Sequence, residues 1–295
     1  MISPDDILTP METEQTPQEP LPRKPIPLRE AVGLYLLGLG LMLSAGLLLQ
    51  TADLRIGLIV TEGGLILLPT LYFVQRNRRS FRRVLSLNRV SAPVLLVVLA
   101  LTVPLRICTF LISAVVQTFL PMPDFILSSL KSIYAELMFF STPLEMILSF
   151  MAIVVMAGVC EEVMFRGFIL HTFLNRKGRW FSIIITGLGF ALYHLDPWAF
   201  PEITIIGIFL GWLVLRTGSI FPAIVAHASF NFLGIFALPR VFGVQTIEDF
   251  LNISFPPYLY PIAFVIFIIL LYLFIRMTSV KTAPIGVDVQ APAMM

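Results

Sequence analysis

Three ionisable side chains stand close together inside a long apolar stretch of the sequence. In "MAGVCEEVMFRGFIL", residues 156–170, these are Glu161, Glu162 and Arg166. An ionised side chain at the middle of a membrane helix costs roughly 2.5–3.5 kcal/mol on insertion scales. Glu162 and Arg166 are four residues apart, so they share a helix face and can neutralise each other. Glu161 is then left without a cation in its own helix, which makes it a candidate general acid or base.

Two further motifs place polar side chains in later apolar stretches. The segment "FALYH" holds Phe190 and His194, and "HASFN" holds His227 and Asn231. The members of each pair are four residues apart, so each pair lies on one face of a helix. Two interpretations stay open at this point. The side chains either form a reactive site with Glu161, or each of them forms a structural hydrogen bond between helices.

The composition identifies the chain as a membrane protein. Its 295 residues are 57% hydrophobic and only 13% charged, with a mean hydropathy of +0.90, whereas roughly a quarter of the residues of a soluble domain are charged. The formal net charge of +2 gives no reason to expect a nucleic-acid partner. Cys108 and Cys160 both lie in apolar stretches, and their spacing forms neither a metal-binding motif nor a disulfide framework.

Apolar stretches along the sequence predict membrane-spanning helices, which need about 20 mostly apolar residues each. The eight candidates, of which the fifth and sixth are short, are residues 31–50, 55–75, 92–120, 143–174, 181–195, 202–216, 219–238 and 258–276. Residues 124–140 have the pattern of an amphipathic helix lying at the membrane surface. The predicted fold class is all-α, a polytopic membrane helical bundle of about eight transmembrane helices and one interfacial helix.

The two ends of the chain differ in composition from its apolar middle. Residues 1–30 are rich in Pro and Glu and are predicted to form a disordered cytosolic tail. Residues 31–277 are the predicted transmembrane domain, and residues 278–295 are a second predicted cytosolic tail.

Lysine and arginine residues set the predicted orientation, because cytosolic loops are enriched in them. Basic clusters follow the second and fourth spans, at residues 76–83 and 175–179. We therefore expect an integral protein of the plasma membrane with both termini in the cytosol. The segment 121–142 is expected on the opposite side.

With this orientation, helix geometry places the polar groups of the three motifs at similar depths. At a rise of about 1.5 Å per residue, Glu161 and His194 each lie ~20 Å from the cytosolic end of their helix. His227 and Asn231 lie ~12–18 Å from that end. Three antiparallel helices are thus predicted to bring a carboxyl group, two imidazoles and an amide together within the membrane.

Other polar residues near or within the spans have predicted structural roles. Thr142 and Glu145 precede the fourth span in the pattern of a helix capping box. His171 is expected at the membrane interface. Glu62 and Arg106 are expected to neutralise each other, with binding of a lipid headgroup or a substrate carboxylate as the alternative role of the arginine.

Together the three motifs resemble the signature of a known protease family. The segments "EEVMFR", "FALYH" and "HASFN" occur in the order E-E-x-x-x-R, F-x-x-x-H and H-x-x-x-N. These patterns mark the CAAX prenyl endopeptidase type II and bacteriocin-processing family (CPBP, also called Abi). The similarity covers about residues 143–239, the predicted catalytic core. It implies an all-helical intramembrane endopeptidase that acts on a membrane-associated protein or peptide, either a prenylated CAAX-type protein or a leader-bearing one.

The resemblance also implies a role for each motif residue. Glu161 would activate the water and His194 would help to hold it, while His227 and Asn231 would stabilise the oxyanion of the tetrahedral intermediate. Such roles suit the reaction, because peptide hydrolysis needs a base for water and donors that face the developing oxyanion. The supporting residues of the motifs are Glu162, Arg166 and Phe190.

Metal use is left open by the resemblance. Members of the family are often called metalloproteases, and Glu161, His194 and His227 could ligate zinc with a water molecule in the fourth position. The sequence contains no H-E-x-x-H motif, and we favour a glutamate mechanism without a cofactor.

Two other functions compete with the protease. A proton-coupled transporter would also hold buried Glu and His residues, but no internal repeat of the kind found in many transporters is evident. A non-catalytic membrane scaffold or immunity-like protein of the same family would be expected to have eroded motifs. All three motifs are intact in this sequence.

Overall fold

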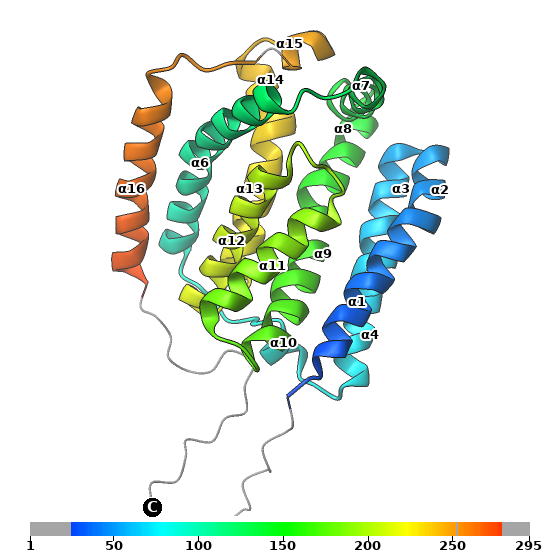
Figure 1. Ribbon diagram of the computed structural model, residues 1–295, viewed down its shortest axis with the longest axis vertical. Coiled ribbons are helices and arrows are strands. Elements are labelled where there is room, and N and C mark those ends of the chain that lie inside the picture. The colour runs from blue at the N-terminus through cyan, green and yellow to red at the C-terminus, as the bar shows by residue number, and fades with distance from the viewer. Residues whose placement is uncertain (1–24, 252, 279–295) are drawn as a thin grey trace, which may run out of the picture. The chain divides into compact units, whose positions relative to one another are not determined.

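The computed structural model describes residues 25–251 and 253–278, and every regular element within these ranges is a helix. Seven of the described helices are long and apolar enough to cross a membrane: Leu28–Ala52, Leu54–Arg76, Ala92–Phe119, Pro143–Leu174, Phe200–Thr217, Phe221–Val241 and Leu259–Met277. Figure 1 shows them assembled as a helical bundle. The predicted polytopic helical bundle is therefore confirmed. Almost all of the two predicted tails lies outside the described residues.

Several spans are built from α-helical pieces joined by π-helical turns. The first two spans consist of α1 (Leu28–Leu41), η2 (Met42–Gly46) and α2 (Leu47–Ala52), then α3 (Leu54–Val60), η3 (Thr61–Leu67) and α4 (Leu68–Arg76). The short α5 (Phe81–Val84) precedes α6 (Ala92–Phe119) and α7 (Asp124–Met138). The fourth span consists of α8 (Pro143–Ser149), η4 (Phe150–Met156), α9 (Ala157–Glu162), η5 (Val163–Ile169) and α10 (Leu170–Leu174). The remaining helices are α11 (Arg179–Tyr193), α12 (Phe200–Thr217), α13 (Phe221–Phe232), η6 (Leu233–Ala237), α14 (Leu238–Val241), α15 (Ile247–Leu251) and α16 (Leu259–Met277).

The fifth predicted span, residues 181–195, corresponds to α11. This helix is apolar but has only 15 residues, or about 22 Å of length, against a hydrocarbon core of about 30 Å. It pairs with α12 along a close crossing, where a Cβ atom on Gly207 would lie 2.9 Å from the Cα atom of Gly187. Small residues allow such close backbone contact between membrane helices. Seven of the eight predicted spans are thus confirmed as helices long enough to cross a membrane, and the fifth corresponds to this shorter apolar helix.

The fourth span, Pro143–Leu174, lies between the first two spans and α11 (Figure 1). Its start has the predicted cap: the Glu145 amide donates to Thr142 Oγ1 at 3.2 Å, and Glu145 Oε2 accepts from the Ser141 amide at 2.8 Å. The Glu145 carboxylate thus accepts from the amide of Ser141, the residue before the N-cap Thr142. Pro143 occupies the first helical turn. The capping box therefore fixes where the longest span begins.

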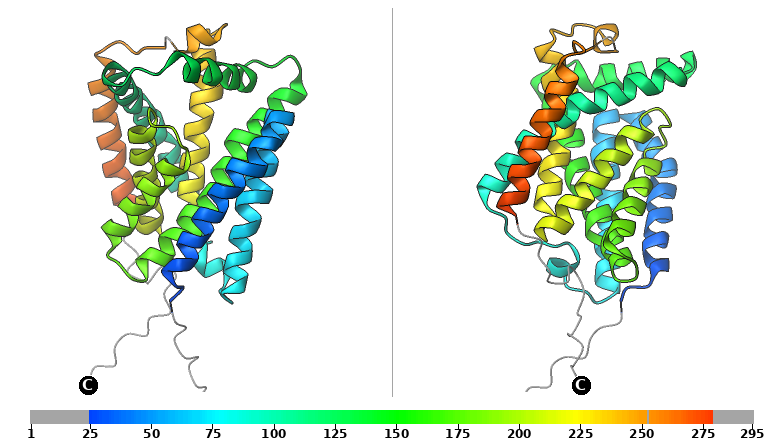
Figure 2. Two further views of the ribbon diagram at one scale, coloured as in Figure 1. Left: turned by 45° about the vertical axis from the view of Figure 1, so that its right-hand side comes forward. Right: turned by 60° about the vertical axis from the view of Figure 1, so that its left-hand side comes forward.

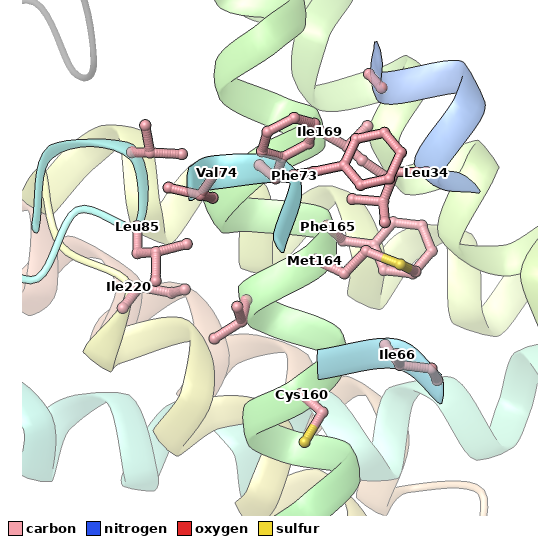
Figure 3. Close-up of a cluster of buried hydrophobic side chains, with 14 of the residues drawn as sticks. Leu34, Ile66, Phe73, Val74, Leu85, Cys160, Met164, Phe165, Ile169 and Ile220 are labelled. Carbon is pink, nitrogen blue, oxygen red and sulfur yellow. The ribbon is translucent and has the colours of Figure 1, made fainter. Parts of the chain in front are cut away.

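Bulky side chains of the fourth span form the centre of the largest apolar cluster. Figure 3 shows Met164 and Phe165 beside Leu34 of the first span and Phe73 of the second. Lipid is as apolar as these side chains, so the cluster holds the helices together mainly through dense van der Waals packing. A second cluster joins α6, α12, α13 and α16 on the other side of the bundle. The two clusters position the fourth span and α13 relative to each other.

The predicted interfacial helix is α7, which lies across the ends of the spanning helices (Figure 2). Its outward Phe125 is 72% exposed, as expected for a helix that contacts the headgroup region. Arg55 fastens it to the bundle: its guanidinium donates to the backbone carbonyl of Glu136 and, at 2.9 Å, to Ser149 Oγ.

His171 lies in α10, at the predicted cytosolic end of the fourth span, and is 2% exposed. Its Nδ1 donates to the Gly167 carbonyl at 2.6 Å, and its Nε2 is 3.0 Å from Ser86 Oγ. The loop that carries Ser86 folds back against the end of the fourth span and covers the imidazole. The position of His171 at the membrane interface stays a prediction, but its burial under this loop was not predicted, because the sequence does not show where the loop packs.

Candidate active site

Three predicted site residues meet at the middle of the bundle. Glu161 lies near the end of α9, His194 caps the C-terminal end of α11, and His227 lies in α13. Glu161 Oε2 is 4.0 Å from His194 Nε2 and 3.9 Å from His227 Nε2. The Glu161 side chain is 10% exposed, whereas the His194 side chain is 31% exposed. The carboxylate is therefore enclosed, but its site has an open side at His194.

The backbone of α11 orients the His194 ring. His194 Nδ1 is 2.8 Å from the Phe190 carbonyl, and a carbonyl can only accept, so Nδ1 carries the hydrogen. In the neutral ring Nε2 is then the acceptor, and this is the nitrogen that faces Glu161. The Phe190 ring packs edge-on against both imidazoles, with centroid distances of 4.7 Å to His194 and 5.6 Å to His227.

The predicted pair of Glu162 and Arg166 is present and completely buried. Glu162 Oε1 accepts from Arg166 Nη1 at 2.6 Å, and both side chains are 0% exposed. Arg166 Nη2 also donates to the Gly207 carbonyl at 3.0 Å, and the guanidinium lies 4.3 Å from the centroid of the Phe190 ring. The arginine thereby ties the fourth span to α11 and α12.

Glu162 has a second role that the sequence did not indicate. His227 Nδ1 lies 2.9 Å from Glu162 Oε1, and a carboxylate oxygen can only accept, so Nδ1 is the donor. This bond turns Nε2 of His227 toward Glu161. One buried carboxylate thus neutralises Arg166 and fixes the orientation of a site histidine, in the way that outer-shell carboxylates hold imidazoles elsewhere.

Asn231 lies one helical turn after His227 in α13. Its Nδ2 donates to the Ile153 carbonyl of η4 at 2.9 Å. The side-chain amide of Asn231 therefore contacts the fourth span, which is the span that also carries Glu161. A side-chain amide has two N–H groups, so one hydrogen remains for another acceptor.

Glu62 and Arg106 do not pair with each other, contrary to the prediction. Arg106 Nη1 forms a short ion pair with Glu202 in the first turn of α12, and its guanidinium lies over the Phe230 ring at 4.6 Å. Glu62 instead lies in η3 with its carboxyl within hydrogen-bonding distance of Glu161. The sequence did show that the second span contains a carboxyl without a counter-charge one helical turn away. It did not show how that helix is rotated, and the rotation decides which residue Glu62 contacts.

The side chains named for zinc lie further apart than the ligands of a tetrahedral zinc ion. Within residues 25–251 and 253–278, no three His, Cys, Asp or Glu side chains are grouped to hold a metal ion. Zinc bonds of about 2.1 Å would place tetrahedral donors about 3.4 Å apart, whereas Glu161 Oε2 lies 3.9–4.0 Å from the two imidazoles. No step of the chemistry below is therefore assigned to a metal.

Comparison with known proteins agrees with the three motifs. Residues 143–233 match the family model described as type II CAAX prenyl endopeptidase Rce1-like. A search of curated proteins and a search of solved structures each gave no match. The matched segment contains Glu161, His194, His227 and Asn231. Over this segment the chain is therefore similar to the Rce1-like type II CAAX prenyl endopeptidases, a family of proteases, as the order and spacing of the motifs predicted.

Proposed function

We propose that the protein is an intramembrane endopeptidase that hydrolyses a peptide bond of a membrane-associated protein. The observation that carries this proposal is the enclosed Glu161 carboxylate, with an imidazole Nε2 on each of two other helices at 3.9–4.0 Å. These separations are too long for direct hydrogen bonds and suit one bridging water. Two hydrogen bonds of about 2.8 Å that meet at 90–105° span about 4.0–4.4 Å.

In this mechanism, water between Glu161 and His194 attacks the carbonyl carbon of the scissile bond. Glu161 takes one proton from the water as the new C–O bond forms, and His194 Nε2 accepts the second hydrogen bond of the same water. Glu161 then gives its proton to the leaving nitrogen as the C–N bond breaks. Positioned acid–base catalysis of this kind contributes about 10²–10⁴ in rate.

The oxyanion of the intermediate is stabilised by α13. Asn231 offers its remaining N–H, and His227 offers Nε2–H when its ring carries both hydrogens. The Glu162 carboxylate accepts a hydrogen bond from His227 Nδ1 and so holds the ring in place. Each donor of this type typically contributes about 10²–10³ in rate.

The substrate proposed within this class is a prenylated protein of the CAAX type. Purified protein in liposomes would be mixed with a farnesylated CAAX peptide or with the same peptide lacking the lipid, and the products identified by mass spectrometry. We expect release of the last three residues from the farnesylated peptide only. Equal cleavage of both peptides would contradict lipid recognition, and cleavage of neither would remove CAAX proteins as the substrate.

We also propose that both termini face the cytosol. Figure 1 shows the ends of α4 and α10 at one end of the bundle, and α7 at the other. In a background with Cys108 and Cys160 replaced by Ala, a membrane-impermeant thiol reagent added to intact cells should label Lys131→Cys. It should not label Arg78→Cys or Lys177→Cys until the cells are opened. Strong labelling of the latter two in intact cells would reverse the orientation.

The proposed mechanism requires no metal. Cleavage should therefore persist after exhaustive treatment with a strong chelator, and elemental analysis should find less than one zinc ion per chain. One tightly held zinc ion that is lost from both His194→Ala and His227→Ala would contradict this and make these residues ligands.

A further inference from the structure

Glu62 is a buried carboxyl to which the mechanism above gives no role. It is 7% exposed and lies in η3, the π-helical turn of the second span. A Cβ atom on the next residue, Gly63, would lie 3.0 Å from Met156 Cε, so η3 runs close to the fourth span just before Glu161. The Glu62 carboxyl is within hydrogen-bonding distance of Glu161 at this approach.

One oxygen of each carboxyl is buried without a hydrogen-bond donor. Oε2 of Glu62 and Oε2 of Glu161 are both buried and have no hydrogen-bond partner among the described residues. Cys160 and Tyr193 lie near both carboxyls, and the Tyr193 hydroxyl is also buried without a hydrogen-bond partner among the described residues. A buried oxygen without a donor is costly, and two adjacent carboxylates cannot both stay ionised at contact. One proton held between the carboxyls resolves both problems.

We propose that Glu62 is a positioning residue for Glu161, an inference that rests on the proposed endopeptidase function. Glu62 holds the proton and donates its O–H to the Glu161 carboxylate. This hydrogen bond from the second span fixes the base opposite His194 and His227, while Glu161 remains ionised and able to take a proton from water. The pair resembles other carboxyl dyads in which one partner stays protonated beside an ionised one.

The first test compares donors at position 62. The assay uses purified protein in liposomes and the farnesylated CAAX peptide. If that peptide is not cleaved, the substrate is a peptide that the wild-type protein cleaves and the Glu161→Gln variant does not. Glu62→Leu removes the donor and should lower kcat about 10- to 100-fold with little change in KM, since a hydrogen bond to a charged group contributes about 1.5–3 kcal/mol. Glu62→Gln retains a donor and should recover most of kcat.

A matched control lies on the same span. Thr70 is fully buried, and its hydroxyl donates to the Ile66 carbonyl of its own helix at 2.7 Å. Thr70→Val should therefore change neither kcat nor KM. A Glu62→Gln variant as slow as Glu62→Leu, or a loss in Glu62→Leu that lies only in KM, would overturn the positioning role.

A second measurement does not depend on activity. Thermal unfolding in detergent would be followed for Glu62→Leu, Glu161→Leu and the double variant. If the two carboxyls share a proton, the effect of Glu62→Leu on the unfolding temperature should be smaller in the Glu161→Leu background. Additive shifts would overturn the contact even if cleavage is observed. Coupled shifts in a protein that cleaves nothing would overturn the proposed function and leave the contact standing.

Discussion

A Glu161→Gln variant is expected to fold normally and to lose cleavage. Glutamine preserves the size of the side chain and much of its hydrogen bonding, but it cannot take a proton from water. The loss should be at least about 10²–10⁴ in kcat, the range for a positioned general base. The measurement is the rate of peptide cleavage by purified protein in liposomes, with thermal unfolding in detergent as the test of folding.

The matched control for this variant is Glu145→Gln on the same span. Glutamine also serves in a capping box, so this variant should keep both its fold and its activity. Cleavage by Glu161→Gln at the wild-type rate would show that another group activates the water.

The other site residues should follow a graded order. His194→Ala should lose nearly as much as Glu161→Gln, because the water loses its second contact. Asn231→Ala should cost about 10²–10³ in rate, the typical effect of losing one oxyanion donor. His227→Ala should fall between them, since His227 faces Glu161 at 3.9 Å and is held by Glu162. A uniform effect of all three would contradict these separate roles.

The second large effect is expected at the buried ion pair. Glu162→Gln leaves the Arg166 guanidinium in a site with 0% exposure and without its anion. Breaking a buried pair in this way typically costs about 3–5 kcal/mol. His227 also loses a charged acceptor at Nδ1. Thermal unfolding in detergent should therefore show a large fall in stability.

The control replaces both partners. Glu162→Met with Arg166→Met removes the pair and leaves no isolated charge, so this double variant should be more stable than Glu162→Gln alone. Its cleavage should still be impaired, because His227 is no longer oriented by Glu162. If the double variant proved less stable than each single variant, the assignment of the pair would be wrong.

Spacing within single helices predicted much of the site. The four-residue spacing of Glu162 and Arg166 fixes their shared face, and the pair forms as expected. Counting residues along the helices placed Glu161, His194 and His227 at similar depths in the membrane. In the structure, Glu161 Oε2 lies 3.9–4.0 Å from Nε2 of both histidines. The cap at Thr142 and the surface helix α7 also follow from local patterns. These features depend on neighbours in sequence or on counting residues along a helix.

Partners on different helices could not be predicted in the same way. Glu62 was assigned to Arg106 because each needed a counter-charge, yet the helices are rotated so that Glu62 faces Glu161 and Arg106 faces Glu202. The burial of His171 was not predicted, because the packing of the loop that carries Ser86 is not encoded in a short motif. Such choices are set by the packing of whole spans, which no single stretch of sequence shows.

In the proposed function, the intramembrane cluster around Glu161 cuts a peptide bond of another membrane protein. Its most direct test compares the membrane proteomes of cells that carry either the wild-type protein or Glu161→Ala at equal abundance, with peptide termini mapped by mass spectrometry. We expect at least one new C-terminus that is present with the wild-type protein and missing with the variant. Identical sets of peptide termini in the two membranes, with both proteins folded, would contradict it.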